Sequence, residues 1–252
     1  MTKRILLGML TPSSNTVLEP VTSAMVRNLP EVSVHFGRFR VTEISLHKQA
    51  LQQFDSMPLL DAAKLLADAK VDAIAWNGTS AGWLGFDTDV QLCEQITAVT
   101  GIPATTSVLA ITEILRDRTF TSFGLVTPYL TDVQARIVEN FSNTGLYCVA
   151  EQHLNLSANF EFSEVSADKL TAMIRNVAAA QPQAIVTFCT NLRAAPLVAK
   201  LEQELEIPIY DTIAAAVWKS LKIAGVEPTR VEGWGSLFTQ MSLCRGSSWN
   251  SI

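Results

Sequence analysis

The sequence lacks the motifs that mark metal proteins, disulfide-rich proteins and nucleotide-binding enzymes. Its 252 residues include only 4 cysteines and 3 histidines, and their positions fit no metal-ligand or disulfide spacing. No glycine-rich phosphate loop of the dinucleotide or Walker type is present. Nothing in the sequence therefore calls for a metal or a cofactor.

Basic clusters and long apolar runs are also missing. The net charge of -5, without a basic patch, argues against a nucleic-acid partner. No apolar run reaches the length needed to cross a membrane. The first apolar run ends at Thr11, which is too short for a signal peptide. We therefore expect a cytoplasmic protein whose cysteines are free thiols. The sequence does not indicate an oligomeric state.

What the sequence does contain is a regular alternation of strand-like and helix-like segments. Apolar residues make up 48% of the chain, enough for a large folded core. The alternation predicts parallel sheets covered by helices. In the first part of the chain, the predicted strands are 5–10, 33–39, 72–76 and 102–105, and the predicted helices are 16–29, 47–69 with a break near 56–58, 87–100 and 108–116.

The alternation begins again near Thr121, with an offset of about a hundred and ten residues. Three segments of the first part return in the same order, and helix 108–115 returns as 213–221. The three pairs are 8–12 with 124–128, 72–75 with 183–186, and 101–104 with 206–209.

This duplication predicts the fold class: α/β, with two pseudo-symmetric halves, each a short parallel sheet flanked by helices, and the active site in the cleft between them. We assign 1–117 plus 213–252 to the first half and 118–212 to the second. The last stretch, 231–252, is expected to pack back on the first half. Four turns should then meet at the cleft: 11–15, 78–80, 127–129 and 189–191.

Cys189 is the strongest catalytic candidate in these turns. It ends an apolar strand-like run, 184–186, and precedes a helical pattern predicted over 192–206. A helix N-terminus next to the thiol would favour the thiolate. The alternative is a buried structural cysteine. We interpret Cys93, Cys148 and Cys244 as structural or incidental.

Gly78, Thr79 and Ser80 occupy the corresponding turn of the first half. They could bind an anion through backbone N–H groups and two hydroxyls, or they could form an ordinary tight turn. Gly78 stands where the second half has Cys189. The predicted cleft therefore has one thiol instead of two facing thiols.

Further polar candidates come from the remaining turns and from one loop. Tyr129 could donate a hydrogen bond to an oxyanion, or it could simply cover the start of a helix. Ser14 and Asn15 are more than a helix cap requires, so they could bind a carboxylate. Thr190 and Asn159 complete the predicted substrate-binding set.

These residues, in this order, resemble the aspartate/glutamate racemase superfamily over nearly the whole chain. Segment 11–16 with 127–129 resembles the maleate cis-trans isomerase branch. Gly78–Thr79–Ser80 with a lone Cys189, segment 129–133 and the tail motif 233–238 resemble arylmalonate decarboxylase. The resemblance implies two pseudo-symmetric halves, no cofactor and, in the racemases, one acid/base cysteine in each half.

The resemblance to arylmalonate decarboxylase implies a mechanism that needs only one thiol. A substituted malonate would bind one carboxylate through Thr79, Ser80, Tyr129 and the backbone near Thr190. The other carboxylate would lie in an apolar pocket near Ile44 and Leu46 and leave as carbon dioxide. The Cys189 thiol, protonated at a reference pKa of ~8.5, would then protonate the enediolate.

Two alternatives stay open. A maleate isomerase or a racemase-like isomerase acting on a small dicarboxylic acid would need an altered acid/base set, because Gly78 can be neither acid nor nucleophile. A non-catalytic protein that binds a small mono- or dicarboxylic acid would need only the cleft.

Overall fold

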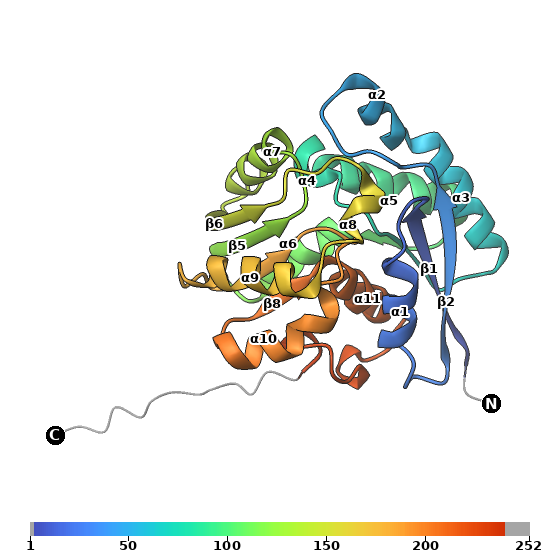
Figure 1. Cartoon of the computed structure of the whole chain (residues 1–252). Coiled ribbons are helices and arrows are strands. Elements are labelled where there is room, and N and C mark those ends of the chain that lie inside the picture. Colours follow the sequence, from blue (N-terminus) through green and yellow to red (C-terminus); the bar gives the residue numbers. More distant parts are fainter. Residues whose placement is uncertain (1–2, 240–252) are drawn as a thin grey trace.

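The computed structural model describes residues 3–239 as two parallel four-stranded sheets with helices packed around them (Figure 1). The first sheet has the order β2-β1-β3-β4, and the second has the order β6-β5-β7-β8. Since the two orders are equivalent, the predicted duplication and fold class are confirmed. The strands are β1 (Ile5–Pro12), β2 (Val32–Phe39), β3 (Ala73–Trp76), β4 (Ala104–Thr106), β5 (Ser122–Thr127), β6 (Tyr147–His153), β7 (Ile185–Thr187) and β8 (Ile209–Asp211).

The helices follow the predicted alternation, and most of them are amphipathic. In α9, for example, Leu170, Met173, Ile174 and Val177 form one buried face, the spacing expected of a helix that covers a sheet. The α-helices are α1 (Leu18–Met25), α2 (Lys48–Leu51), α3 (Ser56–Asp68), α4 (Ala81–Leu84), α5 (Asp87–Thr100), α6 (Ser107–Asp117), α7 (Thr131–Ser142), α8 (Asn159–Phe162), α9 (Ala167–Ala178), α10 (Val198–Leu205) and α11 (Thr212–Ile223). Short 3₁₀ helices are η1 (Gln52–Phe54), η2 (Ala195–Leu197), η3 (Pro228–Arg230) and η4 (Ser236–Phe238).

The helix predicted to follow Cys189 begins later than expected. Residues 190–194 form turns and a bend, η2 follows, and α10 begins only at Val198. Pro196 lies in η2, where it supplies no backbone N–H and disfavours a helical conformation at the residue before it. The prediction that Cys189 lies directly before a helix is therefore wrong.

A segment of the first half crosses the cleft and contacts the second half. Glu43 and Ala158 form an antiparallel bridge. The Ile44 N–H donates to the Ser157 carbonyl oxygen (2.8 Å), and the Asn159 N–H donates to that of Thr42 (2.9 Å). The segment that follows β2 therefore covers one side of the space between the sheets.

The described part of the tail contacts both halves. Arg230 forms an ion pair with Glu31 in the first half. Ser236 donates to Glu202 in the second half, through its N–H (2.6 Å) and its hydroxyl (2.7 Å). The division into 1–117 plus 213–252 and 118–212 stays a prediction, and residues 240–252, with Cys244, lie outside the described residues. Between residues 3 and 239, no helix is long and apolar enough to span a membrane.

Candidate active site

A small cavity lies at the carboxyl ends of the strands, between the two sheets. Its volume is about 20 Å³, enough for roughly one water molecule. It is lined by Pro12, Val41, Ile44, Phe54, Trp76, Gly78, Thr79, Trp83, Tyr129, Asn159, Cys189 and Thr190. Residues from all four predicted turns therefore surround one space.

Hydrogen bonds across the cleft join these turns. Asn15 Nδ2 donates to the Thr190 carbonyl oxygen (3.1 Å) and to Thr190 Oγ1 (3.2 Å). The Thr190 hydroxyl donates to the carbonyl oxygen of Asn77 (2.9 Å), the residue before Gly78. All these groups are buried, so the bonds are shielded from water and fix the turns relative to one another.

Tyr129 connects the first-half turn with the thiol. Its hydroxyl lies 2.6 Å from Thr79 Oγ1 and is also hydrogen-bonded to the Cys189 side chain. The Tyr129 side chain is fully buried, and this desolvation raises its pKa well above the usual value. The phenol is therefore neutral and can donate a hydrogen bond at neutral pH.

The Cys189 thiol is protonated in this environment. Burial raises its pKa to about 12, and the buried Asp211 carboxyl contributes to the increase. The Asn191 N–H lies 3.4 Å from Sγ and, like the Tyr129 hydroxyl, acts in the opposite direction. The expectation that a helix N-terminus would favour the thiolate is wrong, because burial dominates and α10 begins nine residues later.

Gly78 lines the same cavity as Cys189, and the indole of Trp76 occupies the space that a side chain on Gly78 would need. A Cβ atom on Gly78 would lie 1.9 Å from Cζ2 of Trp76. The indole is 1% exposed and packs on Phe39, with ring centroids 4.9 Å apart. The first half therefore has no room for a second acid/base side chain at position 78.

A second network holds the second-half loop in place. Asn191 Nδ2 donates to the Asn159 carbonyl oxygen (2.5 Å), and Asn159 Nδ2 donates to Ser14 Oγ (2.8 Å). Ser14 in turn donates to the Val41 carbonyl oxygen (2.7 Å). Ser14 is therefore a structural link between the turn, the crossing segment and the loop.

Three of the predicted site residues do not line the cavity. They are Ser14, Asn15 and Ser80. Asn15 Oδ1 accepts from the N–H groups of Val17 and Leu18 (both 2.9 Å), so both ends of this side-chain amide already have partners. Ser80 lines a neighbouring pocket instead. Of the two apolar residues expected near the site, Ile44 lines the cavity, and Leu46 lines a separate surface pocket.

Sequence reasoning missed the aromatic wall of the cavity. Trp83 and Tyr129 meet edge to face with centroids 5.4 Å apart, and Phe54 packs on Trp83 at 5.6 Å. The Trp83 indole N–H is buried and has no hydrogen-bond partner in the described structure. Trp76 could have been found from its place at the end of a strand, but Phe54 comes from a long connection that carries no such signal.

The described residues offer no alternative centre for chemistry based on metal ligation or thiols. Among residues 3–239, no group of three His, Cys, Asp or Glu side chains could hold a metal ion. Cys93 lies in α5 and Cys148 in β6, and neither lines the cavity. Burial raises the pKa of Cys93 to about 12 and that of Cys148 to about 11, so both thiols are protonated.

Comparisons with known proteins show sequences similar to this one along nearly its whole length. A maleate isomerase from Geobacillus stearothermophilus is 24% identical over 250 residues, covering 95% of this chain and 99% of that protein. An arylmalonate decarboxylase from Bordetella bronchiseptica is 21% identical over 239 residues, covering 93% and 96%.

Solved structures show the same fold. A cysteine-to-alanine variant of the maleate isomerase from Pseudomonas putida S16, with maleate, has a TM-score of 0.86 at 22% identity and covers 94% of this chain and 98% of that one. A variant of arylmalonate decarboxylase, with one glycine changed to cysteine and one cysteine to serine, has a TM-score of 0.82 at 18% identity and covers 94% and 99%. A family model described as arylmalonate decarboxylase matches residues 13–238, nearly the whole chain, and this protein therefore belongs to the arylmalonate decarboxylase family.

Proposed function

We propose that this protein decarboxylates a substituted malonate without a cofactor and that Cys189 protonates the product. The observation that carries the proposal is that, among residues 3–239, Cys189 is the one thiol lining the cavity. Cys189 and Gly78 line the same cavity, and Trp76 fills the space beside that glycine. Decarboxylation needs only one proton donor at the reacting carbon, because loss of carbon dioxide itself generates the carbanion.

One substrate carboxylate would bind to the polar side of the cavity. The hydroxyls of Thr79 and Tyr129 lie together there, and the partnerless indole N–H belongs to Trp83, which lines the same cavity. Hydrogen-bond donors that are already in place stabilise the negative charge of an enediolate with little reorganisation. Each such donor typically lowers the barrier by ~3 kcal/mol.

The other carboxylate would lie against the apolar side. Val41, Ile44 and Phe54 form this side, and they offer no hydrogen-bond donor from their side chains. A carboxylate there loses its hydration shell, and its conversion to neutral carbon dioxide relieves that cost. The apolar wall therefore favours cleavage of the bond between this carboxylate and the central carbon.

Cys189 supplies the proton that completes the reaction. Cleavage leaves the bonding electron pair on the central carbon as an enediolate and releases carbon dioxide. The Sγ–H bond then breaks and a C–H bond forms, which leaves a thiolate that the Tyr129 hydroxyl and the Asn191 N–H can stabilise. Solvent returns the proton to sulfur. A thiol with a raised pKa suits this role better than that of a nucleophile.

Single-sided protonation follows from the composition of the cavity. Tyr129 and Cys189 are the only titratable side chains that line it among residues 3–239. Burial raises the pKa of Tyr129 well above its usual value, so the phenol stays neutral and cannot act as a second base. The new proton would therefore not be removed from the opposite face, and the product would be one enantiomer of a monoacid.

Substrate entry requires the cavity to enlarge. Its volume of about 20 Å³ is far below the few hundred cubic ångströms of typical small-molecule sites. Val41, Ile44 and Phe54 lie in the segment between β2 and α3, which contacts the second half through only a few backbone bonds. We expect this segment to move away when substrate binds.

The second candidate is maleate isomerisation, and overall similarity supports it better than decarboxylation. Several of the similar proteins are maleate isomerases. One maleate isomerase structure, from Nocardia farcinica, contains a covalently bound succinylcysteine intermediate in a cysteine-to-serine variant. In this protein Cys189 would have to be the nucleophile, and its raised pKa and the absence of a second thiol in the cavity oppose that role.

A paired assay distinguishes the candidates. Purified protein and the Cys189→Ser variant would be incubated with phenylmalonate, with methyl-phenylmalonate and with maleate, while carbon dioxide, proton uptake and fumarate are followed. Cys93→Ser provides a matched thiol replacement outside the cavity. We expect carbon dioxide from the malonates, loss of this activity in Cys189→Ser and full activity in Cys93→Ser.

Two other outcomes would each reject the proposal. Conversion of maleate to fumarate without carbon dioxide release from either malonate would assign the protein to the isomerases. Thermal stabilisation by small dicarboxylates without any turnover would instead indicate a protein that only binds such acids.

A further inference from the structure

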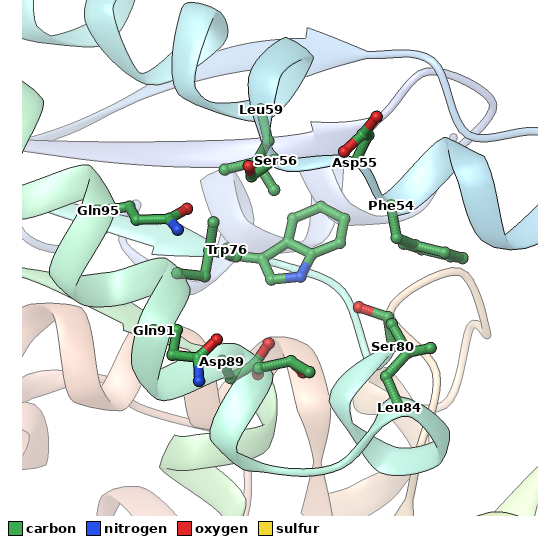
Figure 2. Close-up of a pocket in the computed structure, with 12 residues that line it drawn as sticks. Phe54, Asp55, Ser56, Leu59, Trp76, Ser80, Leu84, Asp89, Gln91 and Gln95 are labelled. Atoms are coloured by element: carbon green, nitrogen blue, oxygen red, sulfur yellow. The ribbon is translucent and has the colours of Figure 1, made fainter.

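A second pocket lies beside the catalytic cavity and shares two of its walls. Its volume is about 280 Å³, more than ten times that of the catalytic cavity. Phe54 and Trp76 line both spaces. In Figure 2 the Trp76 indole lies in the middle of the labelled side chains, with Asp55 and Ser56 on one side and Asp89 and Gln91 on the other.

Asp89 is the unexplained group in this pocket. It lies in the first turn of α5 and is only 2% exposed, although it lines the pocket. Thr106, the N-cap of α6, is the one neighbour that lowers the pKa of this carboxyl, against the larger effect of burial. The carboxyl oxygen Oδ2 has no partner in the described structure. A buried carboxyl oxygen without a partner is costly unless a ligand satisfies it.

The remaining lining residues indicate the charge of that ligand. Among residues 3–239, no lysine, arginine or histidine lines the pocket, and Asp55 contributes a second carboxyl. Gln91 and Gln95 add amide oxygens, and the rings of Phe54 and Trp76 are available for contact with a cation. Anions are disfavoured in such a setting, and hydrogen-bond donors with a positive charge are favoured.

We propose that this pocket binds a small organic ammonium ion, whose N–H groups donate to the Asp89 carboxyl group and whose carbon atoms contact Trp76. The site is separate from the proposed reaction, so the proposal does not depend on which acid the enzyme converts. It adds a ligand-binding site that touches the far side of the indole beside Gly78.

Binding should become tighter as the pH rises. Burial raises the pKa of Asp89 to about 7, so its charge appears near neutral pH. The other groups facing it are Asp55 across the pocket, Cys93 one turn along α5 and Thr106 from α6. A cation that requires the ionised carboxylate should bind about tenfold more tightly at a pH about one unit above this pKa than at one unit below it.

Calorimetric titration of the full-length protein tests the proposal. Ethylammonium chloride is the cationic probe, and propionamide and sodium propionate are the neutral and anionic probes of similar size. We expect saturable binding of ethylammonium alone, weakened at least about tenfold by Asp89→Asn. Asp87→Asn is the matched control, because Asp87 lies exposed in the first turn of the same helix.

Three results would overturn the proposal. One is the absence of saturable ethylammonium binding below about 10 mM. Another is binding that Asp89→Asn and Asp87→Asn weaken equally. The third is a propionamide affinity equal to that of ethylammonium, together with an ethylammonium affinity of the wild-type protein that does not change with pH. The wild-type pH series gives a decision even if the Asp89→Asn variant fails to fold.

Discussion

Trp76 occupies the space beside Gly78 so completely that a Cβ atom there would lie 1.9 Å from its Cζ2 atom. This contact explains in physical terms why position 78, in the first half, carries no side chain and therefore no thiol. It also couples the two cavities, because the same indole lines both. A side chain at position 78 is therefore accommodated without overlap only if the residue at position 76 becomes smaller.

The Gly78→Ala variant should be destabilised by about 1–3 kcal/mol, because its methyl group overlaps the buried indole. We expect the melting temperature to fall by roughly 3–10 °C. Gly37→Ala should cost less, because its nearest contact would be 3.3 Å, to the Ala62 carbonyl oxygen. The double variant Trp76→Leu, Gly78→Ala should lose less stability than the sum of the losses of the two single variants, because the smaller leucine leaves room for the alanine methyl group. Equal stability of Gly78→Ala and wild type would contradict the packing described here.

The Tyr129→Phe variant should lose about 10²–10³ in kcat, because the enediolate loses one donor and the thiolate loses one partner. Tyr147→Phe is the matched control, since Tyr147 is a 56% exposed residue of β6 and should leave kcat unchanged. Steady-state rates on the substrate identified by the paired assay measure both variants. An unaltered kcat in Tyr129→Phe would show that the Tyr129 hydroxyl does not take part in the reaction.

Thr79 and Ser80 should behave differently even though they are adjacent. Thr79 lines the cavity and pairs with Tyr129, whereas Ser80 lines the neighbouring pocket. Thr79→Val should therefore reduce kcat/KM by about tenfold or more, and Ser80→Ala should leave it within about twofold. Comparable losses in both variants would show that Ser80 also reaches the reacting carboxylate.

These two residues show how far the sequence could locate the site. The internal repeat predicts which turns meet, because equivalent strands end at the same edge of each sheet. It does not predict which side chain of a turn points into the cavity. Thr79 lines the cavity, whereas the next residue, Ser80, lines the neighbouring pocket. Which of the two faces the cavity depends on how α4, which follows directly, packs.

The charge state of Cys189 needed the structure for a similar reason. The sequence shows a thiol at the end of a strand but not its burial or its distance from Asp211. Pro196 delays the following helix, and the expected dipole effect on the thiol is lost. The aromatic contacts among Phe54, Trp83 and Tyr129 join segments far apart in the chain, and no local pattern predicts such contacts.

Stability should rise as the pH falls from about 8 to 5. Burial raises the pKa of Asp89 to about 7 and that of Asp211 to about 6, whereas both are near ~3.9 in an unfolded chain. Between these values the folded state binds more protons than the unfolded state, so protonation favours folding. The carboxyls with lowered pKa values, Glu31, Asp72 and Glu204, titrate below this window.

Melting temperatures at several pH values measure this effect. Asp89→Asn should make the melting temperature less dependent on pH above pH 6, and Asp87→Asn should leave the pH dependence of the melting temperature unchanged. Asp211→Asn should make the melting temperature less dependent on pH between pH 5 and 6 and can still cap α11, because an asparagine oxygen accepts the bonds that Asp211 now receives from Ile213 and Ala214. A melting temperature that increases steadily with pH in this window would contradict the assigned pKa directions.

The most direct test of the central claim is the fate of one proton. Methyl-phenylmalonate would be converted in D₂O, and the product would be analysed for enantiomer ratio and for deuterium on the central carbon. One protein thiol on one face predicts carbon dioxide release and a single enantiomer with one deuterium, with the reaction collapsing in Cys189→Ser. A racemic product would mean a second proton donor in the site. Failure to release carbon dioxide, together with conversion of maleate to fumarate, would contradict the account and make Cys189 a nucleophile.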